Sequence, residues 1–97
     1  MKIIKDLNEI TNEITIVDFF ATWCGPCRML TPILEEIKEE GICDVVKVDV
    51  DESREFAMEF KINVVPTLFI LKNKQVVSKK EGYMSFEEVK NWVESNK

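Results

Sequence analysis

Two cysteines separated by two residues, in the motif WCGPC at residues 23–27, constrain this chain more than any other feature. The motif directly follows an apolar run and directly precedes a pattern of helical periodicity. Three residues make almost one helical turn, so Cys27 can lie beneath Cys24 and close a small disulfide loop with it. The motif therefore predicts a strand, a turn and a helix that carry a reversible dithiol.

The predicted start of the helix is a favourable place for a thiolate at Cys24. The unpaired N–H groups and the dipole of a helix N-terminus stabilise negative charge, and the thiolate is the reactive form of cysteine. Cys24 is therefore the expected nucleophile. Cys27 is expected to attack the intermediate that Cys24 forms.

A CxxC pair also occurs as one half of a zinc site, which is the alternative interpretation of this motif. The sequence has no histidine and only one further cysteine, Cys43. A four-ligand site of the usual nitrogen and sulfur type cannot be completed within one such chain. The sequence thus favours redox chemistry and predicts no metal. Cys43 is expected to be a buried structural thiol, with an exposed regulatory thiol as the alternative.

Length and charge narrow the class of protein. Ninety-seven residues predict a single domain over 1–97, expected to be a monomer. The net charge of −5 disfavours nucleic acid as a partner. The opening residues lack the apolar region of a signal peptide, and later apolar runs are too short to span a bilayer. We expect no membrane partner and a cytoplasmic location, where a CxxC pair is more often catalytic than structural.

Periodicity predicts alternating strands and helices. The β-branched and aromatic run at 14–20 is typical of a strand covered on both faces. The other expected elements are an edge strand at 3–4, a short helix at 7–10, a helix at 26–40, a central strand at 43–50, a helix capped by Asp51 that runs to about Phe60, a hairpin of 67–71 with 75–79, and a last helix opened by a Ser85–Glu88 capping box. This order predicts an α/β fold with a central mixed β-sheet flanked by helices on both faces.

The same periodicity predicts which side chains face the core. In the first long helix the apolar positions recur at helical spacing. They are Met29, Leu30, Ile33, Leu34 and Ile37. Sites in such sheets gather at the carboxyl ends of strands, which is where the dithiol follows residues 14–20.

Asp18 interrupts the apolar strand that precedes the motif. An ionised carboxylate there is costly without a partner, and burial is expected to raise its pKa. Two interpretations follow from the residues alone: a backbone or lysine contact satisfies Asp18 in a purely structural role, or Asp18 titrates as part of the site.

The motif and the segments around it resemble the thioredoxin family over nearly the whole chain. WCGPC is similar to the active-site signature of that family. Residues 17–19 resemble the family's strand with a buried acid, and residues 47–51 resemble its central strand. Residues 64–67 resemble its proline loop, and Gly82 matches a glycine that the family carries late in its sequence. The resemblance implies the thioredoxin fold.

The resemblance also implies a catalytic set. In the family the acid matched by Asp18 lies behind the dithiol and helps the cysteine matched by Cys27 to lose its proton. The lysine matched by Lys47 lies near that acid. Cys24, Cys27 and Asp18 are then expected to titrate as a coupled set, with Lys47 beside them.

A second implied set contacts the substrate. Pro66 is implied to be cis and to face the dithiol, although an X-Pro bond by itself is usually trans. Val65 would bind an extended substrate like an added strand, and Gly82 would leave room for it. Within the motif, the implied contact residues are Trp23, Gly25 and Pro26.

The expected function is reduction of protein disulfides through Cys24 and Cys27. The resemblance implies no cofactor beyond the Cys24–Cys27 disulfide, with disulfide-containing client proteins as substrates and a thioredoxin reductase as electron donor. Two alternatives are a glutaredoxin-like enzyme, which draws electrons from glutathione, and a non-catalytic binding module of the same fold.

Three residues depart from the common family pattern, and one of them, Arg28, follows Cys27 where lysine is common. Phe20 stands where many members have a second tryptophan. Lys74 follows Asn73 where glycine is frequent. A side chain disfavours positive φ, so Lys74 argues against the tight hairpin turn typical of Asn-Gly.

Overall fold

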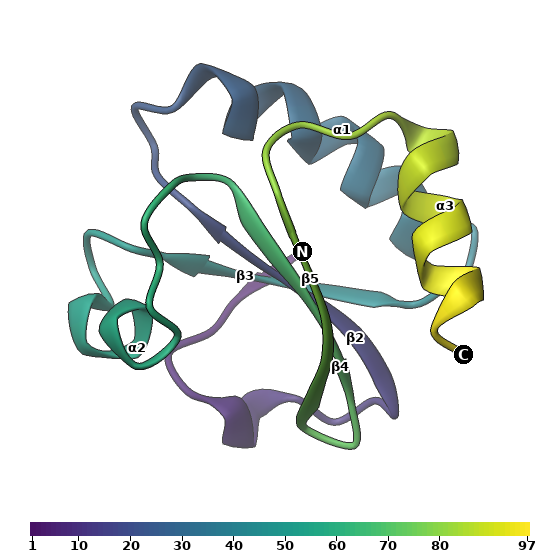
Figure 1. Cartoon of the computed structure of the whole chain (residues 1–97), viewed down its shortest axis with the longest axis horizontal. Coiled ribbons are helices and arrows are strands. Elements are labelled where there is room, and N and C mark those ends of the chain that lie inside the picture. The colour runs from purple at the N-terminus through teal and green to yellow at the C-terminus, as the bar shows by residue number, and fades with distance from the viewer.

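The computed structural model describes residues 1–97 as one mixed sheet with helices on both faces (Figure 1). The elements in chain order are β1 (Lys2–Ile3), the short 3-10 helix η1 (Leu7–Glu9), β2 (Ile14–Phe20), α1 (Gly25–Glu39), β3 (Asp44–Asp49), α2 (Arg54–Glu59), β4 (Thr67–Lys72), β5 (Gln75–Glu81) and α3 (Phe86–Ser95). The predicted α/β class is confirmed. None of these helices combines the length and apolar character needed to cross a membrane.

The sheet order is β1-β3-β2-β4-β5. β3 runs parallel to β1 and to β2, whereas β4 is antiparallel to both β2 and β5. The sheet is therefore mixed, as predicted. The strand predicted as central, at 43–50, corresponds to β3, which lies inside the sheet between β1 and β2. The middle strand is β2, which pairs with β3 on one side and β4 on the other.

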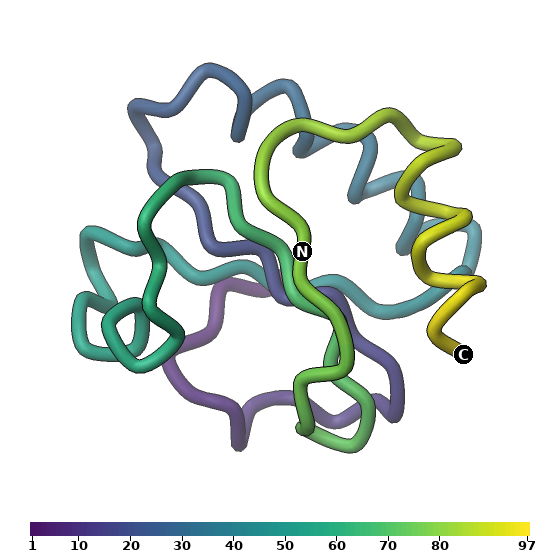
Figure 2. The backbone as a smooth tube through the Cα atoms, viewed as in Figure 1, coloured from purple at the N-terminus to yellow at the C-terminus, as the bar shows by residue number.

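Alternate residues of β2 pack against different helices, because successive side chains of a strand point to opposite faces. Ile16 belongs to the core beneath α1 and α3, whereas Val17 and Phe19 belong to the core on the side of α2. The path of the chain in Figure 2 shows α1 and α3 passing on one side of the strands and α2 on the other. Coverage on both sides explains why β2 is almost wholly apolar.

Helix α1 buries a narrow stripe against the sheet. Cys27, Leu30, Leu34 and Ile37 are buried, and these positions follow the alternating three- and four-residue spacing of one helix face. Met29, predicted to face the core, is instead 62% exposed. It follows the stripe residue Cys27 by two positions, which turns its side chain away from the sheet.

The turn before α2 differs from its prediction. The helix expected to be capped by Asp51 begins at Arg54, with Ser53 at the N-cap position. Asp49 Oδ1 accepts hydrogen bonds from the backbone N–H groups of Asp51 (2.9 Å) and Glu52 (3.3 Å). Asp49 thus holds a turn in which Asp51 does not act as a cap, and the Asp51 side chain remains available for another contact.

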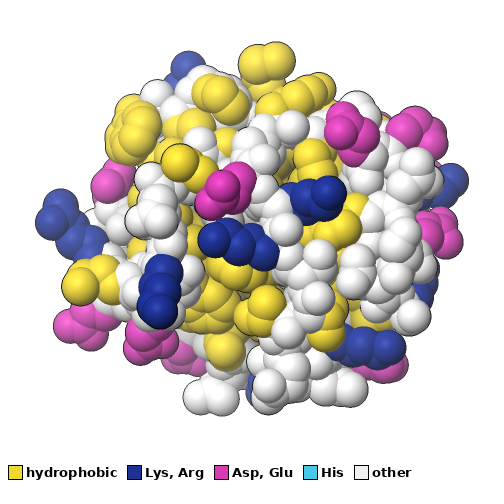
Figure 3. Space-filling view, viewed as in Figure 1, with side chains coloured by type: hydrophobic (Ala, Val, Ile, Leu, Met, Phe, Trp, Pro, Cys, Tyr) yellow, Lys and Arg dark blue, Asp and Glu magenta, His cyan; other side chains and the backbone are white.

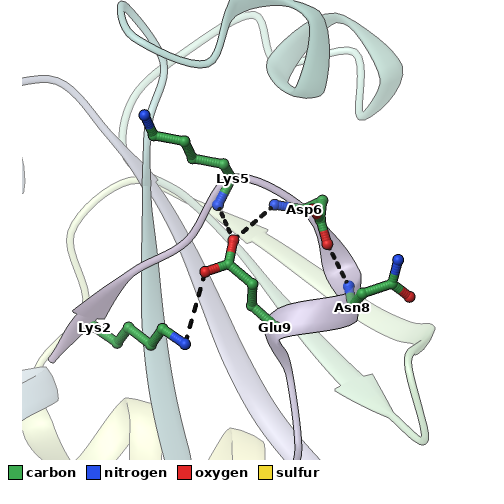
Figure 4. Close-up of polar contacts among 5 residues, drawn as sticks. All are labelled: Lys2, Lys5, Asp6, Asn8 and Glu9. Carbon is green, nitrogen blue, oxygen red and sulfur yellow. Dashed lines mark hydrogen bonds and ion pairs between the residues drawn. The ribbon is translucent and has the colours of Figure 1, made fainter.

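Hydrogen bonds at the start of η1 fix how the chain enters this short helix. At η1, Asp6 Oδ1 accepts from the Asn8 N–H at 2.7 Å, and Glu9 Oε2 accepts from the N–H groups of Lys5 (2.7 Å) and Asp6 (3.3 Å) (Figure 4). Glu9 Oε1 also lies 3.6 Å from Lys2 Nζ of β1. These contacts satisfy N–H groups that a helix start leaves unpaired.

The capping box predicted for the last helix is confirmed. Ser85 Oγ accepts from the Glu88 N–H at 3.2 Å, and Glu88 Oε1 accepts from the Ser85 N–H at 3.1 Å. Farther along α3, Trp92 is buried and its Nε1 donates to Ser78 Oγ of β5 at 2.8 Å. The cap and this contact hold α3 against the sheet.

The β4–β5 turn contradicts the expectation drawn from Lys74. Asn73 and Lys74 have φ values of 50° and 67°, so both adopt the left-handed conformation of a tight hairpin turn. Strand pairing continues to Lys72 opposite Gln75, which leaves only two residues to reverse the chain. Strand pairing therefore overrides the local preference of lysine.

Replacing Lys74 with glycine should stabilise the protein by about 0.5–1 kcal/mol, because glycine adopts positive φ without the steric cost of a side chain. The free energy of unfolding in urea measures the effect. Lys80→Gly is the matched control, because Lys80 lies inside β5, where glycine should destabilise by a similar amount. A loss of stability in Lys74→Gly would contradict this account of the turn.

Candidate active site

The dithiol lies where β2 ends and α1 begins, at the carboxyl end of the middle strand. Cys24 and Cys27 are joined as a disulfide, with their Cα atoms 5.3 Å apart. Cys24 is the N-cap residue of α1, and its Sγ accepts a hydrogen bond from the Cys27 N–H at 3.2 Å. The helix start therefore directs one backbone N–H group at the Cys24 sulfur, an arrangement that favours negative charge there.

The two sulfur-bearing residues lie just under the surface. Cys24 is 4% exposed and Cys27 is 2% exposed, and both pack against Phe20 and Ala21. Trp23, beside them, is 68% exposed. Both cysteines are therefore nearly covered, and Trp23 offers an exposed apolar face next to them.

Gly25 and Pro26 suit the tight start of α1. Pro26 occupies the first turn of the helix, where a missing N–H costs nothing. A side chain built at Gly25 would meet no atom within 4 Å, so the space above the dithiol is open. The structure places both residues next to the disulfide, as the sequence predicted.

The proline loop closes the other side of the dithiol. The Val65–Pro66 peptide bond is cis, and Cys24 Sγ lies 3.6 Å from the carbonyl oxygen of Val65. Gly82 donates its N–H to the carbonyl oxygen of Pro66 at 2.9 Å and has a φ of 89°, which favours glycine. Val65, Pro66 and Gly82, distant in sequence from the motif, are thus brought together beside Cys24.

Asp18 is buried without a hydrogen-bond partner. The even-numbered residues of β2 face α1, so Asp18 lies on the same face as Phe20, which contacts the cysteines. Neither carboxyl oxygen has a protein hydrogen-bond partner, so the interpretation in which a backbone or lysine contact satisfies Asp18 is wrong. Burial raises the pKa of Asp18 to about 7, and the positive charge of Lys47 opposes that rise. Asp18 can therefore gain or lose a proton near neutral pH.

Lys47 lies beside Asp18 but directs its ammonium group toward α1. The two residues are paired in register across β2 and β3. Lys47 Nζ donates to Thr31 Oγ1 at 3.2 Å and lies 4.2 Å from the centre of the Phe20 ring. Thr31 Oγ1 in turn donates to the carbonyl oxygen of Cys27 at 3.1 Å. Lys47 thus acts on Asp18 through its charge and not through an ion pair.

The sequence reasoning did not single out Thr31. The available signal was a hydroxyl four residues after Cys27 on the same helix, at a spacing that brings side chains onto one face. A pocket of about 250 Å³ opens here, lined by Cys27, Thr31 and Lys47 among others. It gives the inner side of the dithiol a path toward the surface.

Asp51, expected to be a helix cap, instead holds Trp23. Trp23 Nε1 donates to Asp51 Oδ2 at 2.9 Å. Asp51 follows the carboxyl end of β3, and Trp23 follows the carboxyl end of the neighbouring β2, so parallel pairing brings them to one edge of the sheet. The position of Asp51 after a strand was the sequence signal for this contact.

Outside this site, Cys43 is half-buried and packs against the core beneath α1 and α3. Burial raises the pKa of its thiol to about 11, which keeps it protonated and unreactive at neutral pH. No group of three or more histidine, cysteine, aspartate or glutamate side chains is placed to hold a metal ion.

Comparison with known proteins gives one consistent family. Residues 3–95 match the family model described as Thioredoxin. A thioredoxin of Staphylococcus aureus is 41% identical over 78 residues, which cover 78% of this chain and 75% of that protein. The structure of a thioredoxin variant from Halobacterium salinarum has a TM-score of 0.83 and 36% identity, and covers 87% of this chain and 74% of its own. The structure of reduced Schistosoma mansoni thioredoxin has a TM-score of 0.83 and 35% identity. The match covers 98% of this chain and 93% of that one.

The raised pKa of Asp18 predicts a pH-dependent stability. Between about pH 4 and 7 the unfolded chain has lost the proton that folded Asp18 retains, so stability falls as pH rises through this range. Asp18→Asn removes this titration and should raise the free energy of unfolding at pH 8. The change that the substitution causes at pH 8 should exceed the change it causes at pH 4 by up to about 4 kcal/mol.

Urea unfolding of the oxidised protein at pH 4, 6 and 8 measures that difference. Glu94→Gln is the control, because Glu94 is exposed on α3 and its replacement should have nearly the same effect at each pH. An effect of Asp18→Asn that does not change with pH would show that burial does not raise the pKa of Asp18.

Proposed function

This chain belongs to the thioredoxin family and is a thiol–disulfide oxidoreductase that reduces protein disulfides, and we propose that Cys24 is its nucleophile and Cys27 its resolving cysteine. One observation carries this assignment. Cys24 is the N-cap residue of α1, and its sulfur accepts a hydrogen bond from the Cys27 N–H, whereas Cys27 lies within the first turn of the helix. The helix start thus favours a thiolate at Cys24, which is the form that attack requires.

The reaction moves two electrons from the dithiol to the client. The Cys24 thiolate attacks one sulfur of the client disulfide, which forms a mixed disulfide and releases the first client thiolate. Cys27 then loses its proton and attacks Cys24 Sγ. The mixed disulfide breaks, the second client thiolate leaves, and the Cys24–Cys27 disulfide remains.

Asp18 is the proposed acceptor of the Cys27 proton. Its pKa of about 7 lets the carboxylate and the carboxylic acid coexist near neutral pH, which is the condition for effective proton transfer. Lys47 tunes this group by its charge, and Thr31 positions the Lys47 ammonium. The three side chains lie on the inner side of the dithiol, away from the arriving client.

The client side of the site is formed by Trp23, Val65 and Gly82. Val65 precedes the cis bond and lies beside Cys24, so its backbone can pair with an extended client segment as an added strand does. Gly25 and Pro26 leave the approach to Cys24 open. These residues bind the segment that surrounds the client cystine.

The remaining proposals concern the cellular setting. We infer that a thioredoxin reductase re-reduces the Cys24–Cys27 disulfide, and that residues 1–97 act as a single-domain monomer in the cytoplasm. WCGPC supports this electron donor over glutathione, because it matches the signature of the family to which the chain belongs. Re-reduction by a thioredoxin reductase with NADPH, and slow re-reduction by glutathione, would separate this proposal from a glutaredoxin-like cycle.

Removal of the nucleophile should abolish activity. In an insulin-reduction assay, Cys24→Ser should lower the rate at least about a hundredfold, to the level without protein, because a hydroxyl cannot form the mixed disulfide. Cys43→Ser is the matched control and should keep the wild-type rate. Equal activity of wild type and Cys24→Ser would refute the mechanism and would favour a binding module.

Removal of the resolving cysteine should trap the intermediate. Cys27→Ser should accumulate a mixed disulfide between Cys24 and an insulin chain, seen as a larger species on a non-reducing gel and lost on addition of dithiothreitol. The double variant with Cys24→Ser should form none. A mixed disulfide that persists in the double variant would mean that another cysteine is the attacking group.

A further inference from the structure

A groove beside the dithiol has a lining that the reaction itself does not require. It has a volume of about 820 Å³ and extends from Trp23 along α2 to Val64 and Val65. Its size falls in the range of sites that hold small ligands or short peptide segments. Because Val65 lies at both the groove and the dithiol, a segment in the groove continues directly to the reacting sulfur.

The groove has an exposed apolar wall. Met58 is 75% exposed, Trp23 is 68% exposed, and Val64 is also exposed. In Figure 3, hydrophobic side chains gather over the N-terminal end of α1, and basic side chains lie nearby over α2. The Trp23 ring is already held by its hydrogen bond to Asp51, so little freedom is lost when a partner packs on it.

Two cations line the same groove without any partner in the chain. Arg54 begins α2, and Lys61 follows its end. Neither forms an ion pair, since the three ion pairs of the protein involve Lys2, Lys38 and Lys79, and neither side chain forms a hydrogen bond. Asp51, the only acidic residue of the lining, is engaged by Trp23. The lining thus carries two cations and one carboxylate, an excess of one positive charge on a protein with a net charge of −5.

Lys61 also has a φ of 54°, a conformation that a lysine adopts only at a cost. Its N–H closes the turn after α2 by donating to the carbonyl oxygen of Met58 at 3.0 Å. A glycine would adopt this conformation without that cost but would leave the groove with one cation.

We propose that this groove selects clients in which an apolar residue near the reactive cystine is flanked by acidic residues. The apolar side chain packs on Trp23 and Met58, and the carboxylates lie near Arg54 and Lys61. These cations are separated by the length of α2, roughly 10 Å, which an extended chain covers in about three residues. The inference rests on the proposed function, because the segment must deliver its disulfide to Cys24.

Disulfide-linked dimers of short synthetic peptides test this preference. One peptide carries Glu-Val-Ala-Glu next to its cysteine, and matched peptides carry glutamine or lysine in place of both glutamates. Each peptide is made in two versions, one with this segment before the cysteine and one with it after the cysteine. The rate constant for reduction by the reduced protein should be about three- to tenfold higher for the glutamate than for the glutamine peptide in at least one placement, and lowest for lysine.

A double variant assigns the preference to the groove. In Arg54→Gln with Lys61→Gln, the ratio of glutamate to glutamine rates should fall to about one. Lys74→Gln with Lys97→Gln removes the same charge from exposed sites outside the groove and should keep the wild-type ratio. In the wild type, the ratio should also fall in about 1 M salt, where charges are screened beyond about 3 Å.

Equal rates for glutamate and glutamine peptides in both placements would overturn the inference while leaving the oxidoreductase function intact. A preference that survives in the Arg54 and Lys61 double variant, or in high salt, would overturn it as well. Failure of the wild type to reduce any of the peptides, with insulin also left intact, would instead remove the proposed function and the inference with it.

Discussion

The junction between β2 and α1 is the constraint on which the site depends. β2 is covered on both faces and held between β3 and β4, so its carboxyl end is fixed, and α1 must start there with Cys24 as its N-cap residue. The helix start supplies the N–H group that the Cys24 sulfur accepts, and the helical turn supplies the separation that lets Cys27 reach it. The chemistry thus follows from backbone geometry more than from any single side chain.

The alternation of side chains along β2 connects this junction to the proposed proton transfer. Every second residue of the strand faces α1, so the position of Asp18 two residues before Phe20 places a buried carboxyl on the cysteine side of the sheet. Parallel pairing then brings Lys47 beside it, and Thr31 of α1 holds the Lys47 ammonium. Burial raises the pKa of Asp18 at a cost in stability, which is the usual relation between an active group and its fold.

The two sides of the dithiol have separate tasks. The inner side holds Asp18 and Lys47, which we propose act on the Cys27 proton, whereas the outer side presents Trp23, the Val65–Pro66 cis bond and the groove along α2. Under these proposals, changes in the groove alter which clients are favoured without altering the proton transfer. Arg54 and Lys61 are the residues through which this chain would set its own preference.

The sequence by itself determined the α/β class, the main elements, the dithiol and the buried acid, because these depend on local periodicity and on the spacing of a few residues. Only the tertiary structure decided that Asp51 binds Trp23 instead of capping α2, that Thr31 engages Lys47, and that Asn73 and Lys74 accept positive φ. It also placed Met29 on the surface and not in the core. These outcomes depend on strand pairing and helix placement between residues distant in sequence, and such contacts override the preference of any one residue.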